Sequence, residues 1–312
     1  MIKKSKLFAI TIIIIVLLLG IGIINGLPLN AQVEDTTTLS NNTLEVIFLD
    51  VGQGDSILLK TGDHNMLIDA GDIGKDSIIL NYLAKYNVTS LDYIVATHPH
   101  ADHIGSMPSV IRKMDNVGTI IMPDKTHTTK AFENLLNAIE DNDIAITIPK
   151  SGDNFTLGNA SVQILAPNSG GYSDINDYSI VLRVEFGETA FLFTGDAGST
   201  SEAQQMSNGL TLESDVLKVG HHGSRTSSSQ RYLDAVSPNY AVISSGAGNT
   251  YGHPHSELLS RLNAMGVTIY RTDLNGTIVF TSDGKEIFVS SENKFYAMEE
   301  VITESVYIMS NN

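Results

Sequence analysis

The sequence predicts an α+β fold in which two β-sheets pack face to face and helices cover their outer sides. The chain has 312 residues, of which 42% are hydrophobic and 17% are charged, so it has the composition of a globular protein with a large core. Strand-like and helical segments alternate from residue 44 onward, in two successive halves that each contain both. No linker separates the halves, so we expect one domain over residues 44–296.

The first half should begin with strands and continue with helices between further strands. Apolar runs indicate strands at residues 44–49, 56–60, 66–69 and 93–96. The turn residues Thr61–Asn65 join the second and third of these strands as a hairpin. Apolar side chains between Ile78 and Tyr86 have the spacing of one helix face. Further helices and strands are expected near Ile111 and at 119–122, 131–139 and 145–148.

The second half repeats this alternation. Residues 178–186 and 189–193 form a predicted hairpin around Gly187 and Glu188. Further strands are expected at 216–219 and 240–243, and helical segments at 231–236 and 257–265. Gly266 follows the last helix as its stop signal.

The first 31 residues have a different character from the rest of the chain. Lys3, Lys4 and Lys6 precede a segment, 7–27, that carries no charge. About 20 apolar residues span a bilayer as a helix, and lysines before such a span keep the N-terminus cytoplasmic. We therefore predict that residues 1–31 form a membrane anchor with the domain extracytoplasmic. The alternative is a cleaved signal peptide and a secreted protein. Residues 32–43 read as a polar linker and 297–312 as an acidic tail.

The composition excludes several kinds of site. The chain has no cysteine, which rules out disulfides, Cys-ligated zinc, iron–sulfur clusters and thiol nucleophiles. Its net charge of −16 argues against broad clamping of a nucleic-acid backbone. A few cations near a later histidine pair, Lys218, Arg225 and Arg231, are nevertheless expected to hold one or two phosphates. The sequence indicates no obligate protein partner.

The clearest functional pattern is Thr97–His103, which reads T-H-P-H-A-D-H directly after a predicted buried strand. Pro99 disfavours helix at His98, so His98 and His100 lie in extended backbone and project to the same side. Asp102 and His103 follow where a helix would begin. Three imidazoles and a carboxylate within six residues predict two adjacent metal half-sites, one from the His pair and one from the Asp–His pair.

Two later strand ends add potential ligands. Asp196 follows the run Phe191–Phe193 and is suited to bridge two ions, because a carboxylate has lone pairs for both. His221 and His222 end another strand, and Gly223 next to them permits close backbone approach. One of the two histidines is expected to bind metal. The other supports the ligands or contacts the substrate, and the sequence leaves open which does which.

These patterns resemble the metallo-β-lactamase superfamily, which combines H-x-H-x-D-H, a later bridging Asp and a final His on an αββα sandwich. Within it, the chain resembles the hydrolase domain of ComEC-type DNA-uptake proteins and is similar to bacterial phosphorylcholine esterases of the same branch. The likeness spans about residues 44–290. It is carried by the motifs L-D-V-G-Q-G-D-S (49–56), L-I-D-A-G (67–71), D-Y-S-I-V-L (177–182), H-H-G-S (221–224) and Y-G-H-P-H (251–255).

The resemblance implies a role for each of these residues. His98 and His100 would bind one metal ion, Asp102, His103 and either His221 or His222 the second, and Asp196 would bridge them. Asp102 and Asp196 are also the candidates for assisting proton transfer. Residues expected to contact the substrate or to support the ligands are Gln53, Asp55, Asp69, Ser179, Ser224, Arg225, His253 and His255. His64 and His127 are expected at the surface.

Many superfamily members place a further metal-binding His between the first cluster and the bridging Asp. Here Asn176–Ser179 stands at that point, so the first ion is expected to have fewer protein ligands. With N and O ligands only, two Zn²⁺ ions are the first choice, and Mn²⁺ or iron the alternatives.

The expected function is hydrolysis of a phosphodiester, as in a nuclease of ComEC-like type, by a metal-bound hydroxide. The expected substrate is a phosphoester, with DNA as one candidate. Small or surface phosphoesters are the main alternative substrates, and β-lactams a third. A surface binding protein with an inactive metal site is the alternative from a different class.

Overall fold

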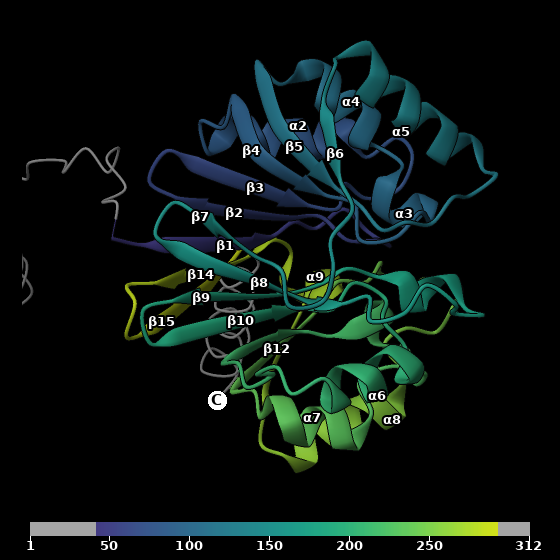
Figure 1. Ribbon diagram of the computed structural model, residues 1–312. Coiled ribbons are helices and arrows are strands. Elements are labelled where there is room, and N and C mark those ends of the chain that lie inside the picture. The colour runs from purple at the N-terminus through teal and green to yellow at the C-terminus, as the bar shows by residue number, and fades with distance from the viewer. Residues whose placement is uncertain (1–41, 293–312) are drawn as a thin grey trace, which may run out of the picture. The chain divides into compact units, whose positions relative to one another are not determined.

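A computed structural model describes residues 42–292 (Figure 1). The predicted N-terminal segment (1–31), most of the predicted linker (32–43) and the predicted tail (297–312) lie outside the described residues. Within residues 42–292, no helix is both long and apolar enough to cross a membrane.

Two β-sheets form the centre of the domain, as the sequence predicts. The first sheet has eight strands, in the spatial order β15 (Ile287–Ser291), β14 (Ile278–Ser282), β1 (Leu44–Phe48), β2 (Ile57–Thr61), β3 (His64–Ile68), β4 (Ser90–Val95), β5 (Asn116–Ile121) and β6 (Ala145–Thr147). The second has seven, in the order β13 (Thr268–Arg271), β12 (Tyr240–Ile243), β11 (Val216–Lys218), β10 (Thr189–Phe193), β9 (Val181–Phe186), β8 (Ala160–Ala166) and β7 (Asn154–Leu157).

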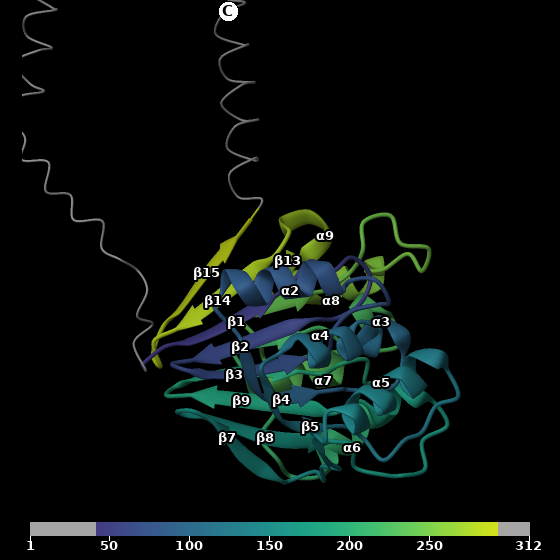
Figure 2. The ribbon, with the colours of Figure 1, turned by 90° about the horizontal axis from the view of Figure 1, so that it is seen from above.

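Helices cover the outer side of each sheet (Figures 1 and 2). Those against the first sheet are α2 (Asp76–Lys85), α3 (Ala101–Ile104), α4 (Met107–Lys113) and α5 (Lys130–Asp141). Those against the second are α6 (Ser199–Ser207), α7 (Gln230–Val236) and α8 (Ser256–Ala264). Short helical turns lie in the loops: η1 (Ile175–Tyr178), η2 (Gly220–Gly223) and α9 (Thr272–Asn275). Side chains define two of the helix starts, because Thr129 and Ser229 accept the N–H groups of Phe132 and Tyr232.

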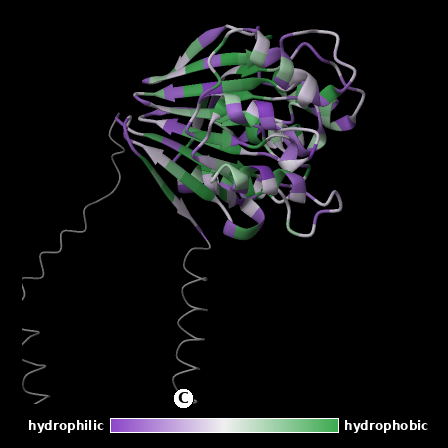
Figure 3. Ribbon diagram, turned by 90° about the horizontal axis from the view of Figure 1, so that it is seen from below, coloured by the Kyte–Doolittle hydropathy of each residue, from purple (hydrophilic) through white to green (hydrophobic). Residues whose placement is uncertain are grey.

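Three apolar layers hold this arrangement together, and strand alternation creates them. In β1, Val46 and Phe48 pack between the two sheets, whereas Ile47 packs against the helices of the first sheet. In β10, Phe191 lies between the sheets and Leu192 packs toward α7 and α8. Figure 3 shows the hydrophobic segments along the strands. Both faces of each central strand are therefore buried, which explains their nearly continuous apolar sequences.

The strand directions bring distant residues to one edge of the sandwich. Strands β3 to β6 run parallel in the first sheet, and β10 to β13 run parallel in the second. The C-terminal ends of parallel strands meet at one edge of a sheet, where ligands commonly bind in such folds. The loops after β3, β4, β10 and β11 carry Asp69, His98–His103, Asp196 and His221–His222 respectively.

The structure corrects some of the predicted elements. The predicted strand from Tyr178 begins at Val181, because residues 175–178 form the turn η1. The hairpin of β7 and β8, the helix α6 and the strands β13 to β15 were not predicted. Three of them, β7, β13 and β15, are partly exposed edge strands, so their sequences mix polar and apolar residues.

Candidate metal centre

The loop after β4 places His98 and His100 as the sequence predicts. His100 is extended (φ −78°, ψ 149°) and precedes α3. The Nε2 atom of His98 and the Nδ1 atom of His100 lie 3.0 Å apart. Two nitrogens bound to one tetrahedral Zn²⁺ at 2.0–2.1 Å would lie about 3.3 Å apart. The pair therefore has the spacing of two ligands of one ion.

A second group of ligand atoms lies next to the first. The Nε2 atoms of His103 and His222 are 3.3 Å apart. Oδ2 of Asp102 lies 3.2 Å from Nε2 of His222. These distances again fit the ligands of one ion. His103 comes from the first sheet and His222 from the second, so this half-site joins the two halves of the domain.

Asp196 lies between the two groups. Its Oδ2 is 3.8 Å from Nε2 of His98 and 3.5 Å from Nε2 of His222, while its Oδ1 is 3.4 Å from Nε2 of His103. The side chain is buried, and Oδ1 has no hydrogen-bond partner. A buried carboxylate oxygen without a donor is costly unless a cation satisfies it. The position therefore fits the bridging role predicted for Asp196.

Asp69 supports the ligands from behind. Its Oδ2 lies 2.7 Å from Nδ1 of His103, and its oxygens also accept the backbone N–H and the hydroxyl of Thr97. A carboxylate on the remote ring nitrogen fixes the orientation of a metal-binding His. Of the two roles expected for Asp69, substrate contact or ligand support, these contacts favour ligand support.

Ser179 connects two of the predicted ligands. Its Oγ accepts the backbone N–H of Asp196 and lies 3.4 Å from Nδ1 of His98. Ser179 belongs to the segment that stands where many relatives place an additional histidine. Thr97 also contacts this nitrogen of His98, at 3.2 Å, so Nε2 is the nitrogen that would bind a metal ion.

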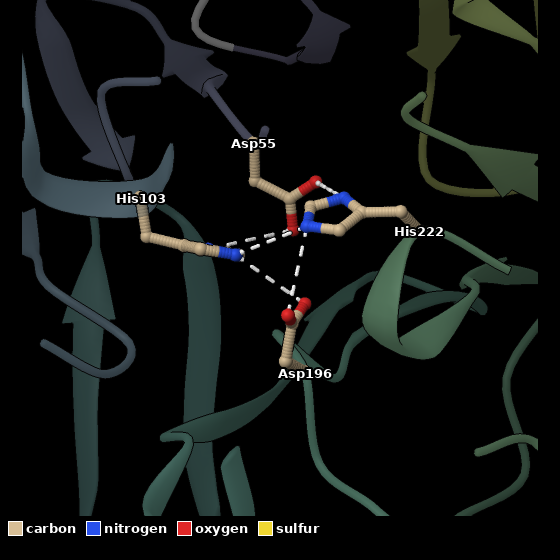
Figure 4. Close-up of side chains that lie close together, drawn as sticks. All are labelled: Asp55, His103, Asp196 and His222. Carbon is tan, nitrogen blue, oxygen red and sulfur yellow. Dashed lines mark hydrogen bonds and ion pairs between the residues drawn. The ribbon is translucent and has the colours of Figure 1, made fainter. Parts of the chain in front are cut away.

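Asp55 is a buried residue of the site that pairs with a buried lysine. Figure 4 shows the imidazoles of His103 and His222 between the carboxylates of Asp55 and Asp196. One potential ligand atom from each of these four residues lies within 4.8 Å of the other three. However, Oδ2 of Asp55 is 2.9 Å from Nζ of Lys218, and its Oδ1 faces Nδ1 of His222 at 3.5 Å. We therefore interpret Asp55 as a support behind the histidines, with Asp102 on the metal side.

The expectation that Lys218 holds substrate phosphate is wrong. Lys218 is the last residue of β11 and shares a strand face with Val216, which packs between the two sheets. Its side chain is therefore buried, where Nζ contacts Asp55 and donates to the carbonyl of Val219. Arg225 and Arg231 do lie on the surface.

Electrostatics distinguish the two half-sites. Burial, together with the charge of neighbouring His103, holds the pKa of His98 well below its usual value. Burial alone would also lower the pKa of His222, but Asp196, Asp102 and Asp55 outweigh it and raise that pKa to about 10. The same balance, with Asp196 and Asp69 as the main carboxylates, raises the pKa of His103. In the metal-free chain the first pair is thus neutral, whereas the second pair holds protons that a cation must displace.

The backbone at η2 determines which histidine faces the site. His221 and His222 both have left-handed backbone conformations, with φ of 51° and 53°. This conformation costs roughly 1–3 kcal/mol per non-glycine residue and is concentrated at functional sites. His222 is buried among the other ligands, whereas His221 is partly exposed with its Nε2 3.8 Å from Asp196. The geometry favours His222 as the metal ligand and His221 as a residue that faces the substrate.

An open pocket of about 290 Å³ lies over the metal centre. Its lining includes His100, Asp102, Asp196, His221, Tyr251 and His253. Of the two histidines in the Y-G-H-P-H motif, His253 therefore faces the pocket. His255 instead accepts the backbone N–H of Arg225 through Nδ1, which makes it a support for the loop. Tyr251 was not among the predicted site residues, although it belongs to the same motif.

The remaining predicted residues organise loops around the pocket. Oε1 of Gln53 accepts the backbone N–H of Gly246, and the hydroxyl of Ser224 contacts that of Thr226. Arg225 is exposed, with its guanidinium 3.9 Å from Glu257. Neither Gln53 nor Ser224 is among the lining residues of the pocket.

The two histidines expected at the surface differ. His64 is exposed and pairs with Asp92 at 3.1 Å, as expected. His127 is half-buried, and its ring centroid lies 5.9 Å from that of His100. His127 thus reaches the surface with only part of its ring, because the loop after β5 folds back toward the metal loop.

Residues 49–247 match the family model of the Metallo-beta-lactamase superfamily. The chain belongs to this superfamily. Its members are generally hydrolases, and the fold binds metal ions. The matched range contains all the predicted metal ligands of the chain. The αββα sandwich predicted from the sequence is the fold of the superfamily.

Curated relatives within the superfamily confirm the predicted resemblance to ComEC-type proteins. The chain is 30% identical over 255 residues to ComE operon protein 3 of Bacillus subtilis. The alignment covers 76% of this chain and 33% of that protein. It is 34% identical over 241 residues to Competence protein ComA of Neisseria gonorrhoeae, and this alignment covers 77% of this chain and 32% of that protein. The chain thus spans about a third of the length of these relatives.

Solved structures of the superfamily fold are also similar. YhfI, a metallo-beta-lactamase fold protein from Bacillus subtilis, has a TM-score of 0.54 at 12% identity, covering 77% of this chain and 99% of that one. CmlA, a diiron β-hydroxylase from Streptomyces venezuelae, has a TM-score of 0.51 at 14% identity, covering 77% and 54%. At such identities the likeness shows the fold alone.

The role of Asp69 within this superfamily site can be tested by substitution. Asp69→Asn should weaken metal binding by about 10- to 100-fold, because an amide no longer holds His103 as a carboxylate does. Affinity is measured by competition with a chromophoric chelator, and folding by circular dichroism. Asp92→Asn is a matched control, since Asp92 contacts the exposed His64 in the same way. Equal affinities of Asp69→Asn and the unaltered chain would contradict the supporting role.

Proposed function

We propose that the chain is an extracytoplasmic, metal-dependent phosphodiesterase with nuclease activity. The observation that carries the proposal is the pair of half-sites that share Asp196 at the floor of an open pocket. A structural metal site would close its coordination, whereas here one side remains accessible to a substrate. The relatives named as competence proteins favour a DNA-related substrate. The extracytoplasmic location rests on the sequence of residues 1–31.

The donor set fits two divalent cations. Four carboxylates, those of Asp55, Asp69, Asp102 and Asp196, surround the histidines, and the site has one buried lysine to offset them. His98 and His100 would hold one ion, Asp102, His103 and His222 the other, and Asp196 both. Bound cations of this kind supply Lewis acidity and an activated water. Zn²⁺ suits these ligands, and Mn²⁺ or iron are the alternatives.

The chain's own residues would bind and orient the substrate. His221 and His253 line the pocket outside the ligand groups, where each could donate a ring N–H to a phosphate oxygen. Burial and the charges of His221 and His222 lower the pKa of His253 to about 4. His253 is therefore neutral at pH 7, so it serves as a hydrogen-bond donor and not as a source of protons. Asp69, on the remote nitrogen of His103, and the carbonyl of Ser244, on that of His222, keep the ligand rings fixed as the substrate enters.

A substrate panel tests this proposal. The metal-loaded full chain is offered bis(p-nitrophenyl) phosphate, p-nitrophenyl phosphorylcholine, linear DNA and a β-lactam, with metal content measured in parallel. We expect turnover of the first and of DNA with Zn²⁺ or Mn²⁺. His64→Ala is the control for effects of losing a histidine, because His64 lies at the surface. Preference for the phosphorylcholine ester would favour small phosphoesters, and no turnover of any phosphoester would refute the proposal.

A further inference from the structure

Tyr251 is an exposed aromatic residue at the mouth of the metal pocket. Two large aromatic side chains of residues 42–292 are strongly exposed, Tyr251 at 65% and Phe288 at 56%. Phe288 lies on the edge strand β15, whereas Tyr251 lines the same pocket as Asp196 and His222. Its ring stacks on His253, with centroids 5.6 Å apart and an interplanar angle of 23°. The ring therefore has a fixed neighbour on one side and is largely open to solvent.

The loop that carries Tyr251 is held in place by hydrogen bonds. Asn249 accepts the backbone N–H of His253 and donates to the carbonyls of His253 and Gly246. The N–H of His255 donates to the carbonyl of Gly223, where a side chain would collide with Pro254. These contacts attach the loop to the metal-binding turn. A ring presented on such a rigid loop loses little entropy when it binds a planar partner.

The position of the ring suits a nucleobase. A phosphate bound at the metal centre carries a sugar on each side, and a base extends from that sugar toward the rim of the pocket. Every base has a π-face, and stacking on an aromatic side chain is how proteins bind single strands without reading their sequence. A quaternary ammonium group is instead enclosed by several Trp, Tyr or Phe rings, and the lining of this pocket contains one such residue, Tyr251.

Stacking also selects the state of the nucleic acid. A base within a duplex is covered by its neighbours, so Tyr251 can reach the face of an unpaired base only. The net charge of −16 limits phosphate contacts with any nucleic acid, so stacking contributes a larger share of the binding free energy. We propose that Tyr251 is a stacking platform for an unpaired nucleobase, so that the site acts on single-stranded nucleic acid. This inference rests on the proposed phosphodiesterase function for the position of the phosphate.

Binding tests the stacking separately from hydrolysis. Fluorescein-labelled phosphorothioate oligonucleotides, as single-stranded DNA, single-stranded RNA and duplex DNA, are titrated into the Zn²⁺-loaded full chain and followed by anisotropy. Tyr251→Ala should raise Kd for single strands about tenfold or more, and Tyr251→Phe should restore binding. Phe288→Ala, the matched exposed aromatic, should match the unaltered chain. The Kd values for single-stranded DNA and single-stranded RNA show which of the two binds more tightly to the site with Tyr251.

Cleavage locates the stacked base. In a single-stranded DNA series with one abasic site moved along the strand, hydrolysis should slow at one fixed distance from the missing base. Tyr251→Ala should abolish this dependence. Equal Kd values for Tyr251→Ala and the unaltered chain, equal binding of duplex and single strand, or no binding at all would each overturn the inference. Binding that depends on Tyr251 without any cleavage would support stacking by Tyr251 and refute the proposed phosphodiesterase function.

Discussion

Exchanging Asp196 for asparagine is expected to lower metal-dependent phosphodiester hydrolysis by about a thousandfold or more, while the domain stays folded. Asp196 is the side chain that lies near ligands of both half-sites, 3.8 Å from His98 and 3.5 Å from His222. An amide keeps the shape of the carboxylate and removes its charge, so it cannot join two cations. Losing several kcal/mol of transition-state stabilisation by the ions corresponds to a rate loss of this size.

Metal content and unfolding should be measured together with the rate. We expect the Asp196→Asn variant to retain fewer equivalents of metal than the unaltered chain and to unfold cooperatively. Asp177→Asn is a useful comparison, because Asp177 is another buried aspartate near the site, yet it accepts the backbone N–H groups of Gly198 and Ser201 and contacts no predicted ligand. Its substitution should affect stability and leave metal stoichiometry intact. Full activity of Asp196→Asn would exclude the bridging role.

The parts of the site that could be predicted from sequence are those that local pattern determines. H-x-H-x-D-H is contiguous, and the extended backbone around Pro99 dictates that His98 and His100 point the same way. Asp196 and His222 each follow a buried apolar strand. Parallel strands end at a common edge, which places these residues beside the first motif. The fold could be predicted in the same way, because the apolar patterns of the strands and helices indicate two sheets with helices outside them.

What could not be predicted depends on contacts between segments far apart in the chain. The choice between His221 and His222 depends on left-handed backbone that no local pattern reveals. The contact of His127 with His100 depends on the path of the loop after β5. The position of Lys218 required knowing that its strand face points between the sheets toward Asp55. The sequence did carry one signal: Lys218 is the single charged residue within the otherwise apolar segment 216–219, which indicates a buried lysine.

Replacing Lys218 with methionine is expected to destabilise the domain by about 3–5 kcal/mol, because it removes the cation nearest to the buried carboxylate of Asp55. Unfolding of the metal-free chain by urea measures this. Lys60→Met is the comparison: Lys60 is also a buried strand lysine, but its Nζ donates to the neutral side chain of Asn65, and the acid opposite it, Glu45, is only partly buried. Its loss should cost about 1 kcal/mol, the value of an ordinary hydrogen bond.

The pH dependence identifies the cause of that destabilisation. Burial alone would raise the pKa of Asp55, but Lys218 and the nearby His222 lower it to about 2. In the unfolded chain the pKa is about 3.9, so the paired carboxylate stabilises the fold above pH 4 and loses this effect as the pH falls toward 2. Without Lys218, Asp55 gains its proton more readily in the folded state. The difference between the free energies of unfolding of the unaltered chain and of Lys218→Met should therefore narrow as the pH falls from the raised pKa of Asp55 in the variant toward 2.

A double substitution separates the charge from the packing. Asp55→Asn together with Lys218→Met removes both charges at nearly constant volume, and such replacements are often neutral for stability. The double variant should therefore recover most of the stability lost in Lys218→Met. A double variant as unstable as Lys218→Met would show that the aliphatic packing of the lysine, and not the unpaired charge of Asp55, holds this part of the fold.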